Sequence, residues 1–100
     1  MIEPVDLFSF IPRCERGEIG RRPYVVYRYK IIDFLDLHYG LDCEGSWYFS
    51  ACNTQTAEIV SDDVASEDEA KARLKEAYTS FLMRHPVTRL LRACQSKSAA

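Results

Sequence analysis

Lysine and arginine are absent from a long central part of this chain. The sequence has 100 residues, with 13 Lys and Arg, 15 Asp and Glu, and a formal net charge of −2. Residues 31–69 contain ten carboxylates and no Lys or Arg, whereas residues 1–30 carry a net charge of +2 and residues 70–100 one of +6. Such a division predicts surfaces of opposite charge and indicates a charged partner rather than a particular fold.

Long apolar runs are also missing. No segment approaches the roughly 20 apolar residues that a membrane-spanning helix requires. The opening residues, MIEPVDLF, lack the basic start and the apolar stretch of a secretion signal. We therefore expect a cytoplasmic protein with no membrane partner.

Sequence motifs for catalysis and metal binding are lacking as well. The four cysteines have none of the short C-x₂₋₄-C spacings of zinc sites and are expected to be reduced thiols: Cys14, Cys43, Cys52 and Cys94. A zinc site built from His38, Cys43 and Cys52 would require the fold to bring them together. The chain has no Ser-His-Asp arrangement and no phosphate-binding glycine loop. We expect a protein that is not an enzyme, with no catalytic residue, metal or cofactor.

Alternation of apolar and polar residues predicts strands in the first two-thirds of the chain. From Val25 to Tyr39 the pattern has period two, which predicts one long strand, or two joined by a bulge near Ile32–Asp33. We also expect strands at residues 5–11, 46–52 and 57–61. Turns are expected at residues 40–46 and 53–56, and residues 13–23 are expected to form a loop because they contain two glycines and a proline.

The C-terminal third predicts a helix with a well-defined start. Ser66 and Glu69 are spaced as a capping box, and apolar residues follow at helical spacing up to His85–Pro86. Residues 87–94 predict a short second helix, whose apolar residues are a candidate contact between copies of the chain. We expect residues 95–100 to be a disordered tail.

These elements predict an α+β fold for a single domain, residues 1–94. An antiparallel meander of three to four strands would carry one long C-terminal amphipathic helix on one face, with the short second helix after it. The predicted core consists of the residues that share the apolar faces: Val25, Tyr27, Ile31, Leu35, Trp47, Phe49, Leu74, Tyr78, Phe81 and Leu82.

The segment RRPYVVYRYK at residues 21–30 raises the possibility of nucleic-acid binding. Single-strand binders stack bases on aromatic rings and hold phosphates with cations on the same surface. Here Tyr27 and Tyr29 alternate with Arg28 and Lys30, so the rings and these charges point to opposite faces. A purely electrostatic phosphate patch remains as the alternative function, formed by Arg21, Arg22, Arg28 and Lys30.

The acidic part of the chain predicts a protein-binding surface. Asp42 and Glu44 are expected at a hairpin tip, and Asp62 and Asp63 in the loop before the helix. A dense acidic rim can pair with the basic channel of a partner that handles nucleic acid. Its candidate residues are Asp33, Asp36, Asp42, Glu44, Asp62 and Asp63. Helix capping and loop solubility are the simpler explanation, but they do not account for the missing cations.

Residues 45–84 read as an aromatic strand, a short turn, a second strand, and Ser-x-x-Glu-Ala-Lys at the start of an amphipathic helix. This order, over 40 of the 100 residues, resembles small accessory proteins of phages and prophages, some of which are anti-CRISPR proteins. The resemblance implies a non-catalytic inhibitor that occludes a bacterial nucleic-acid-targeting defence complex, in the host cytoplasm. The modest net charge departs from strongly acidic DNA mimics, so it implies a local acidic patch. The order is also similar to that of some antitoxins, which likewise bind a protein.

Overall fold

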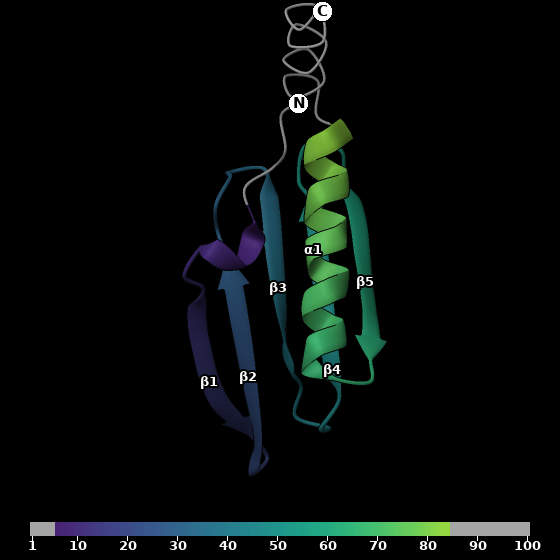
Figure 1. Ribbon diagram of the computed structural model, residues 1–100. Coiled ribbons are helices and arrows are strands. Elements are labelled where there is room, and N and C mark those ends of the chain that lie inside the picture. Colours follow the sequence, from purple (N-terminus) through teal and green to yellow (C-terminus); the bar gives the residue numbers. More distant parts are fainter. Residues whose placement is uncertain (1–5, 85–100) are drawn as a thin grey trace, which may run out of the picture.

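The computed structural model describes residues 6–84 of the chain. A short 3₁₀ helix precedes five strands and one α-helix, in the order η1 (Leu7–Ser9), β1 (Arg13–Ile19), β2 (Arg22–Tyr29), β3 (Leu35–Leu41), β4 (Trp47–Asn53), β5 (Glu58–Val64) and α1 (Glu67–Arg84). The strands form one antiparallel sheet in sequence order. The helix lies along one face of this sheet, over β3, β4 and β5 (Figure 1). The predicted α+β meander with a C-terminal helix is confirmed, but the predicted strand number is wrong, because the sheet has five strands rather than three to four.

The first two predicted elements are both wrong. Residues 5–11 were expected to form a strand, but η1 lies there because Asp6 caps a turn, its Oδ1 accepting from the N–H of Phe8 at 3.1 Å. The expected loop at residues 13–23 contains β1 and its hairpin to β2. Gly20 and Arg21 both have positive φ, 58° and 67°, as the tight two-residue hairpin turn requires. β1 is an edge strand with nearly all residues exposed, so its sequence does not alternate.

The long strand expected from Val25 to Tyr39 is in fact two strands. The chain reverses at residues 30–34, and β2 pairs antiparallel with β3, with Val25 opposite Leu41. The N–H of Leu35 donates to the carbonyl of Ile32 at 3.1 Å and closes the turn. The predicted bulge near Ile32–Asp33 therefore marks a full reversal. The apolar period continues through the turn because both strands place their apolar residues on the helix side of the sheet.

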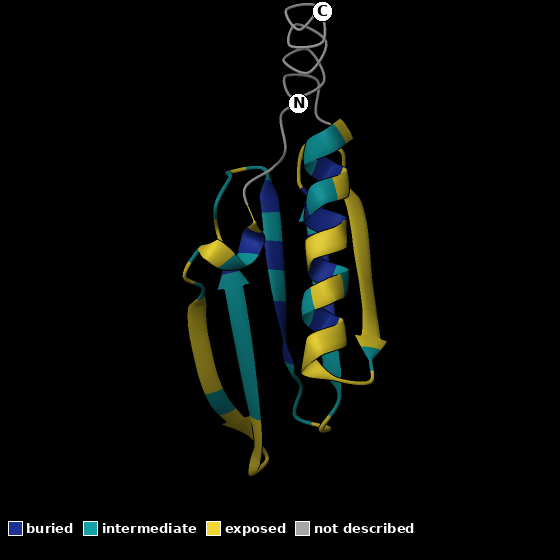
Figure 2. Cartoon of the chain, in the orientation of Figure 1, coloured by how far each residue is buried: buried dark blue, intermediate teal, exposed yellow. Residues whose placement is uncertain are grey.

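The core lies between α1 and the middle of the sheet. Of the ten predicted core residues, five are buried: Leu35, Phe49, Leu74, Tyr78 and Phe81. The other five are only partly buried, against the prediction: Val25, Tyr27, Ile31, Trp47 and Leu82. The reason is the position of the helix, which leaves β2 and the ends of the central strands incompletely covered (Figure 2).

The predicted capping box forms the start of α1. The hydroxyl of Ser66 accepts from the N–H of Glu69 at 3.1 Å, and a Glu69 carboxylate oxygen accepts from the N–H of Ala65 at 3.0 Å. These bonds satisfy two donors where the helix has no internal acceptor. The predicted second helix, with Cys94, and the tail at residues 95–100 lie outside the described residues.

We predict that Phe81→Ala lowers the free energy of unfolding by about 3–5 kcal/mol, because Phe to Ala in a core removes apolar contact and leaves a cavity. Phe81 is 2% exposed and belongs to the core between α1 and the sheet. Chemical denaturation followed by circular dichroism measures the change. Ile59→Ala is the control, because Ile59 is 66% exposed and truncation there should change the value by about 0.5 kcal/mol or less. Equal effects of the two substitutions would contradict the placement of α1.

Candidate functional site

Carboxylates from three segments gather at one end of the molecule. The β3–β4 turn, the end of β5 and the start of α1 all lie at the same end (Figure 1). We call this group the acidic end and define it by seven residues: Asp42, Glu44, Asp62, Asp63, Glu67, Asp68 and Glu69. All but Asp42 are exposed to solvent. Seven of the ten carboxylates of residues 31–69 thus lie at one end of the molecule.

Asp42 has a structural role within the acidic end. Its Oδ1 accepts from the N–H groups of Glu44 and Ser46, each at 2.9 Å. The N–H of Asp42 donates to the carbonyl of Ser46 at 2.9 Å, which closes the turn. Gly45 has a φ of 83°, a conformation that glycine adopts without strain. The turn therefore holds Glu44 outward, as the sequence predicts for a hairpin tip.

Asp62 and Asp63 lie on β5, not in the loop before the helix as predicted. Their polar character resembles that of a loop, but β5 is an edge strand and tolerates polar residues on both faces. Neighbouring residues of a strand point to opposite faces. Asp62 faces α1, where its Oδ2 lies 3.9 Å from Arg73 Nη2. Asp63 faces the other side of the sheet and forms no salt bridge within residues 6–84.

The remaining two predicted acids do not belong to the acidic end. Asp33 lies in the β2–β3 connection, at the opposite end of β3 from Asp42. Asp36 lies on the face of the sheet away from α1, with its Oδ1 3.5 Å from Arg28 Nη1 and 3.8 Å from His38 Nδ1. These two candidate partner-binding acids therefore lie apart from the acidic end.

The predicted basic patch is divided between the two ends of β2. Arg21 and Arg22 stand at the tip of the β1–β2 hairpin, while Arg28 and Lys30 lie at the other end of the strand. The six residue steps from Arg22 to Arg28 separate them by about 20 Å along an extended strand. The side-chain ion pair with Asp36 also partly neutralises Arg28. As predicted, the ring of Tyr29 lies on the helix face, where only 4% of the residue is exposed.

Two tyrosines that the sequence pattern did not single out share a face with Arg28. Tyr24 and Tyr48 lie on the face of the sheet away from α1, as Arg28 and His38 do. The ring of Tyr48 meets His38 edge to face, with centroids 5.7 Å apart. The alternation of β2 contained the signal for Tyr24, because its even position matches that of Arg28 and differs from that of Tyr27.

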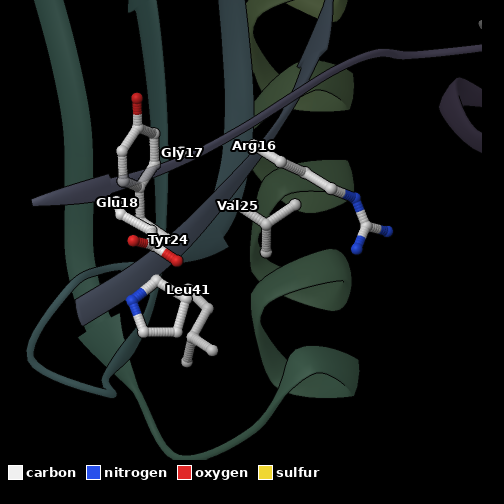
Figure 3. Close-up of a pocket in the computed structure, with 7 residues that line it drawn as sticks. Arg16, Gly17, Glu18, Tyr24, Val25 and Leu41 are labelled. Carbon is white, nitrogen blue, oxygen red and sulfur yellow. The ribbon is translucent and has the colours of Figure 1, made fainter. Parts of the chain in front are cut away.

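A shallow hollow lies beside the β1–β2 hairpin, on the helix side of the sheet. It has a volume of about 430 Å³ and is lined by Arg16, Gly17, Glu18, Pro23, Tyr24, Val25 and Leu41 (Figure 3). Tyr24 turns its ring away from the side chain of Arg16 and packs over Gly17, where a Cβ would lie within 3 Å of that ring. The lining is mainly apolar, with one cation and one carboxylate at its edge. It contains no His, Cys or Ser that could serve as a nucleophile or base.

The residues considered for zinc are not brought together. His38 lies opposite Ser50 and Cys52 lies opposite Asp36 in the β3–β4 ladder, whereas Cys43 lies in the turn beyond its end. Within residues 6–84 no group of three or more His, Cys, Asp or Glu side chains is arranged to hold a metal ion. No helix in the same part of the chain is long and apolar enough to cross a membrane.

Comparison with known proteins gives no relative on which a function could be based. No protein-family model matches the sequence. No curated protein and no solved structure is significantly similar to it.

The surroundings of His38 lower the pKa of its imidazole. Burial lowers its pKa, and the nearby carboxylate of Asp36 partly opposes this effect. Arg28 on β2 lowers the pKa further, and Tyr48 on β4 covers the ring. The enclosed Nδ1 has no hydrogen-bond partner within the described residues. The neutral imidazole is therefore the form that the fold favours.

We predict that His38 makes the folded state weaker in mild acid. Because its folded pKa lies below the unfolded value of about 6.5, the unfolded chain binds the proton more readily. The contribution to stability is complete above about pH 6.5 and is lost as the pH falls toward the folded pKa. Melting temperatures between pH 7 and pH 5 should fall more steeply for the wild type than for His38→Gln. Parallel curves for the two proteins would show that His38 titrates normally.

Proposed function

We propose that this chain is a non-catalytic protein-binding domain whose acidic end docks on a basic surface of a partner. The observation that carries the proposal is the convergence of seven carboxylates from three segments at one end of the molecule. Within residues 6–84, the only salt bridge at this end joins Arg73 to Asp62, at 3.9 Å between exposed side chains. Such a pair contributes about 0–1 kcal/mol and leaves most of the negative charge available.

Helix capping accounts for only part of this charge. Ser66 and Glu69 supply the capping hydrogen bonds, and acids in the first turn interact favourably with the helix dipole. Glu44 and Asp63 belong to other elements and contribute nothing to that cap. Exposed charges of one sign speed association with an oppositely charged surface and exclude partners of the same sign.

The partner class that we propose is a bacterial complex that binds nucleic acid. Such complexes expose channels rich in Lys and Arg, whose positive charge is complementary to the negative charge of the acidic end. The resemblance of residues 45–84 to phage accessory proteins supports the same class. Occupation of the channel by this domain would block access of the nucleic acid, so the domain would act as an inhibitor of the anti-CRISPR type. Direct binding of nucleic acid through the basic residues has less support, because those cations are divided between two ends of β2.

Affinity capture from bacterial lysate, with and without nuclease, tests the class of partner. We expect a nucleic-acid-handling complex to remain bound to the tagged protein after nuclease treatment. Loss of every partner on nuclease treatment would instead favour the basic residues, with nucleic acid as the direct ligand. In that case affinity for DNA or RNA should fall steeply with salt, as phosphate contacts require.

We predict that neutralising the exposed acids weakens binding to the captured partner at least tenfold, which equals about 1.4 kcal/mol. The variant combines Glu44→Gln, Asp63→Asn, Glu67→Gln and Asp68→Asn, and it keeps Asp42, Asp62 and Glu69, which form the turn, the ion pair and the cap. Titration calorimetry at two salt concentrations measures the change.

The matched control neutralises four exposed acids outside the acidic end: Asp6→Asn, Glu15→Gln, Asp33→Asn and Glu76→Gln. Both variants change the net charge equally, so only position distinguishes them. We expect the control to bind within about twofold of the wild type, since screening weakens charges farther than about 8–10 Å from the contact. Equal losses in both variants would mean that net charge, and not the acidic end, directs binding.

A further inference from the structure

We infer that β5 is the docking strand of the acidic end, and that the partner contributes an extended basic segment that pairs with β5 as a sixth strand. This inference rests on the proposed function and gives it a specific mode of binding. In strand addition, main-chain hydrogen bonds supply affinity, while alternate side chains supply specificity. The experiment below separates this mode from simple attraction between charges.

The outer edge of β5 is open within the described residues. β5 pairs with β4 along its whole length, from Asn53 opposite Glu58 to Trp47 opposite Val64, and no described strand lies on its other side. Six of its seven residues are exposed, which Figure 2 shows as a continuous yellow strand. An edge of this length presents a row of unpaired N–H and C=O groups that an incoming strand can use.

The sides of β5 offer apolar contacts to an added strand. Ile59 is 66% exposed on the face away from α1, and Val60 is 41% exposed on the helix side. Next to Val60, a groove of about 220 Å³ runs between β5 and α1. Its lining combines Phe49, Val60, Ala77 and Phe81 with the polar side chains Arg73, Glu76, Ser80 and Arg84. The side chains of an added strand alternate between faces, so one set would lie over this groove and the other beside Ile59.

The charges on β5 identify a basic segment as the partner. Glu58 and Asp62 point to the helix side, where they pair with Arg84 at 2.8 Å and Arg73 at 3.9 Å, and Asp63 points to the other side. β5 itself thus carries three carboxylates and no cation. Pairing of two β5 strands from two copies would bring these carboxylates together, and like charges on neighbouring strands are destabilising. A segment with Lys or Arg on both faces would instead form cross-strand pairs. The opposite edge, β1, mixes Arg and Glu and has no such preference.

The test uses a fluorescein-labelled heptapeptide, Lys-Lys-Val-Val-Lys-Lys-Val, which places Lys on both faces when it is extended. A version with Glu in place of every Lys is the control for charge. A third peptide carries N-methyl groups on alternate residues, which keeps the charge but removes the N–H donors of one edge. Fluorescence anisotropy gives affinities, and amide chemical shifts of the labelled protein locate the contact. We expect the basic peptide to bind, the β5 amides to shift, and the N-methyl peptide to bind at least tenfold more weakly.

Two protein variants complete the test. In a strand, neighbouring residues direct their N–H groups to opposite edges, so either Val60→Pro or Ser61→Pro removes an outward N–H and keeps the β4–β5 ladder. The variant that keeps the wild-type melting temperature is used. Its affinity for the basic peptide should be at least tenfold lower than that of the wild type, although every carboxylate remains. Asp63→Asn should weaken binding of the same peptide, while the β5 amides whose chemical shifts change on binding should stay the same.

Several results would overturn the inference. Equal affinity for the basic and the N-methyl peptides, or for the wild type and the folded proline variant, would mean that charge alone attracts the partner. The proposed function would then stand without strand addition. Absence of peptide binding, or shifts confined to other strands, would exclude β5 as the docking strand. Shifts on β5 that depend on protein concentration would assign the edge to a second copy of the chain. Failure of the proposed function itself is seen separately, in the capture experiment and its charge variants.

Discussion

Packing of α1 against β3 and β4 determines which surfaces of this domain remain available. Leu74, Tyr78 and Phe81 form one buried row on the helix, and Phe49 and Leu37 on the sheet belong to the same core. Within residues 6–84 one helix covers only part of one face, and it leaves the opposite face and both edge strands open. The same packing brings the start of the helix beside the β3–β4 turn and the end of β5. The acidic end is thus a consequence of how the core is assembled.

The meander makes this arrangement possible with short connections. Each strand pairs with its neighbour in sequence, so the connections lie alternately at the two ends of the sheet. The β3–β4 turn and the β5–α1 connection fall at one end, while the β2–β3 and β4–β5 connections fall at the other. Because connections alternate between the two ends, the connection to which an acidic residue belongs determines the end of the sheet at which it lies. Asp42 and Asp63 are placed together, whereas Asp33 is placed at the far end.

The sequence allowed reliable prediction where local chemistry determines the structure. The spacing of Ser66 and Glu69 and the apolar stripe that follows predict α1, and alternation predicts β4 and the orientation of Tyr29. Sequence patterns failed where tertiary position overrides them. β1 is exposed on both faces and lacks alternation, so it resembled a loop, and the reversal at residues 30–34 keeps the period of a single strand.

The candidate site was also predicted only as far as local sequence determines it. The shortage of cations identified Glu44 and Asp63 as candidates, but it also selected Asp33 and Asp36, because charge along a sequence does not specify which end of a strand a residue occupies. Convergence of the helix acids Glu67 and Asp68 with the β3–β4 turn depends on contacts distant in sequence. The division of the basic residues by the length of β2 likewise required the strand boundaries.

The exposed edge of β5 places two demands on its charges. An open strand risks pairing with copies of itself, and proteins reduce this risk by placing charge on the edge. Charges of both signs, as on β1, would discourage all strands about equally. Charges of one sign exclude identical strands because they repel, but they leave a strand of opposite charge free to pair. The absence of Lys and Arg from β5 therefore protects the edge from self-association and at the same time selects a cationic partner.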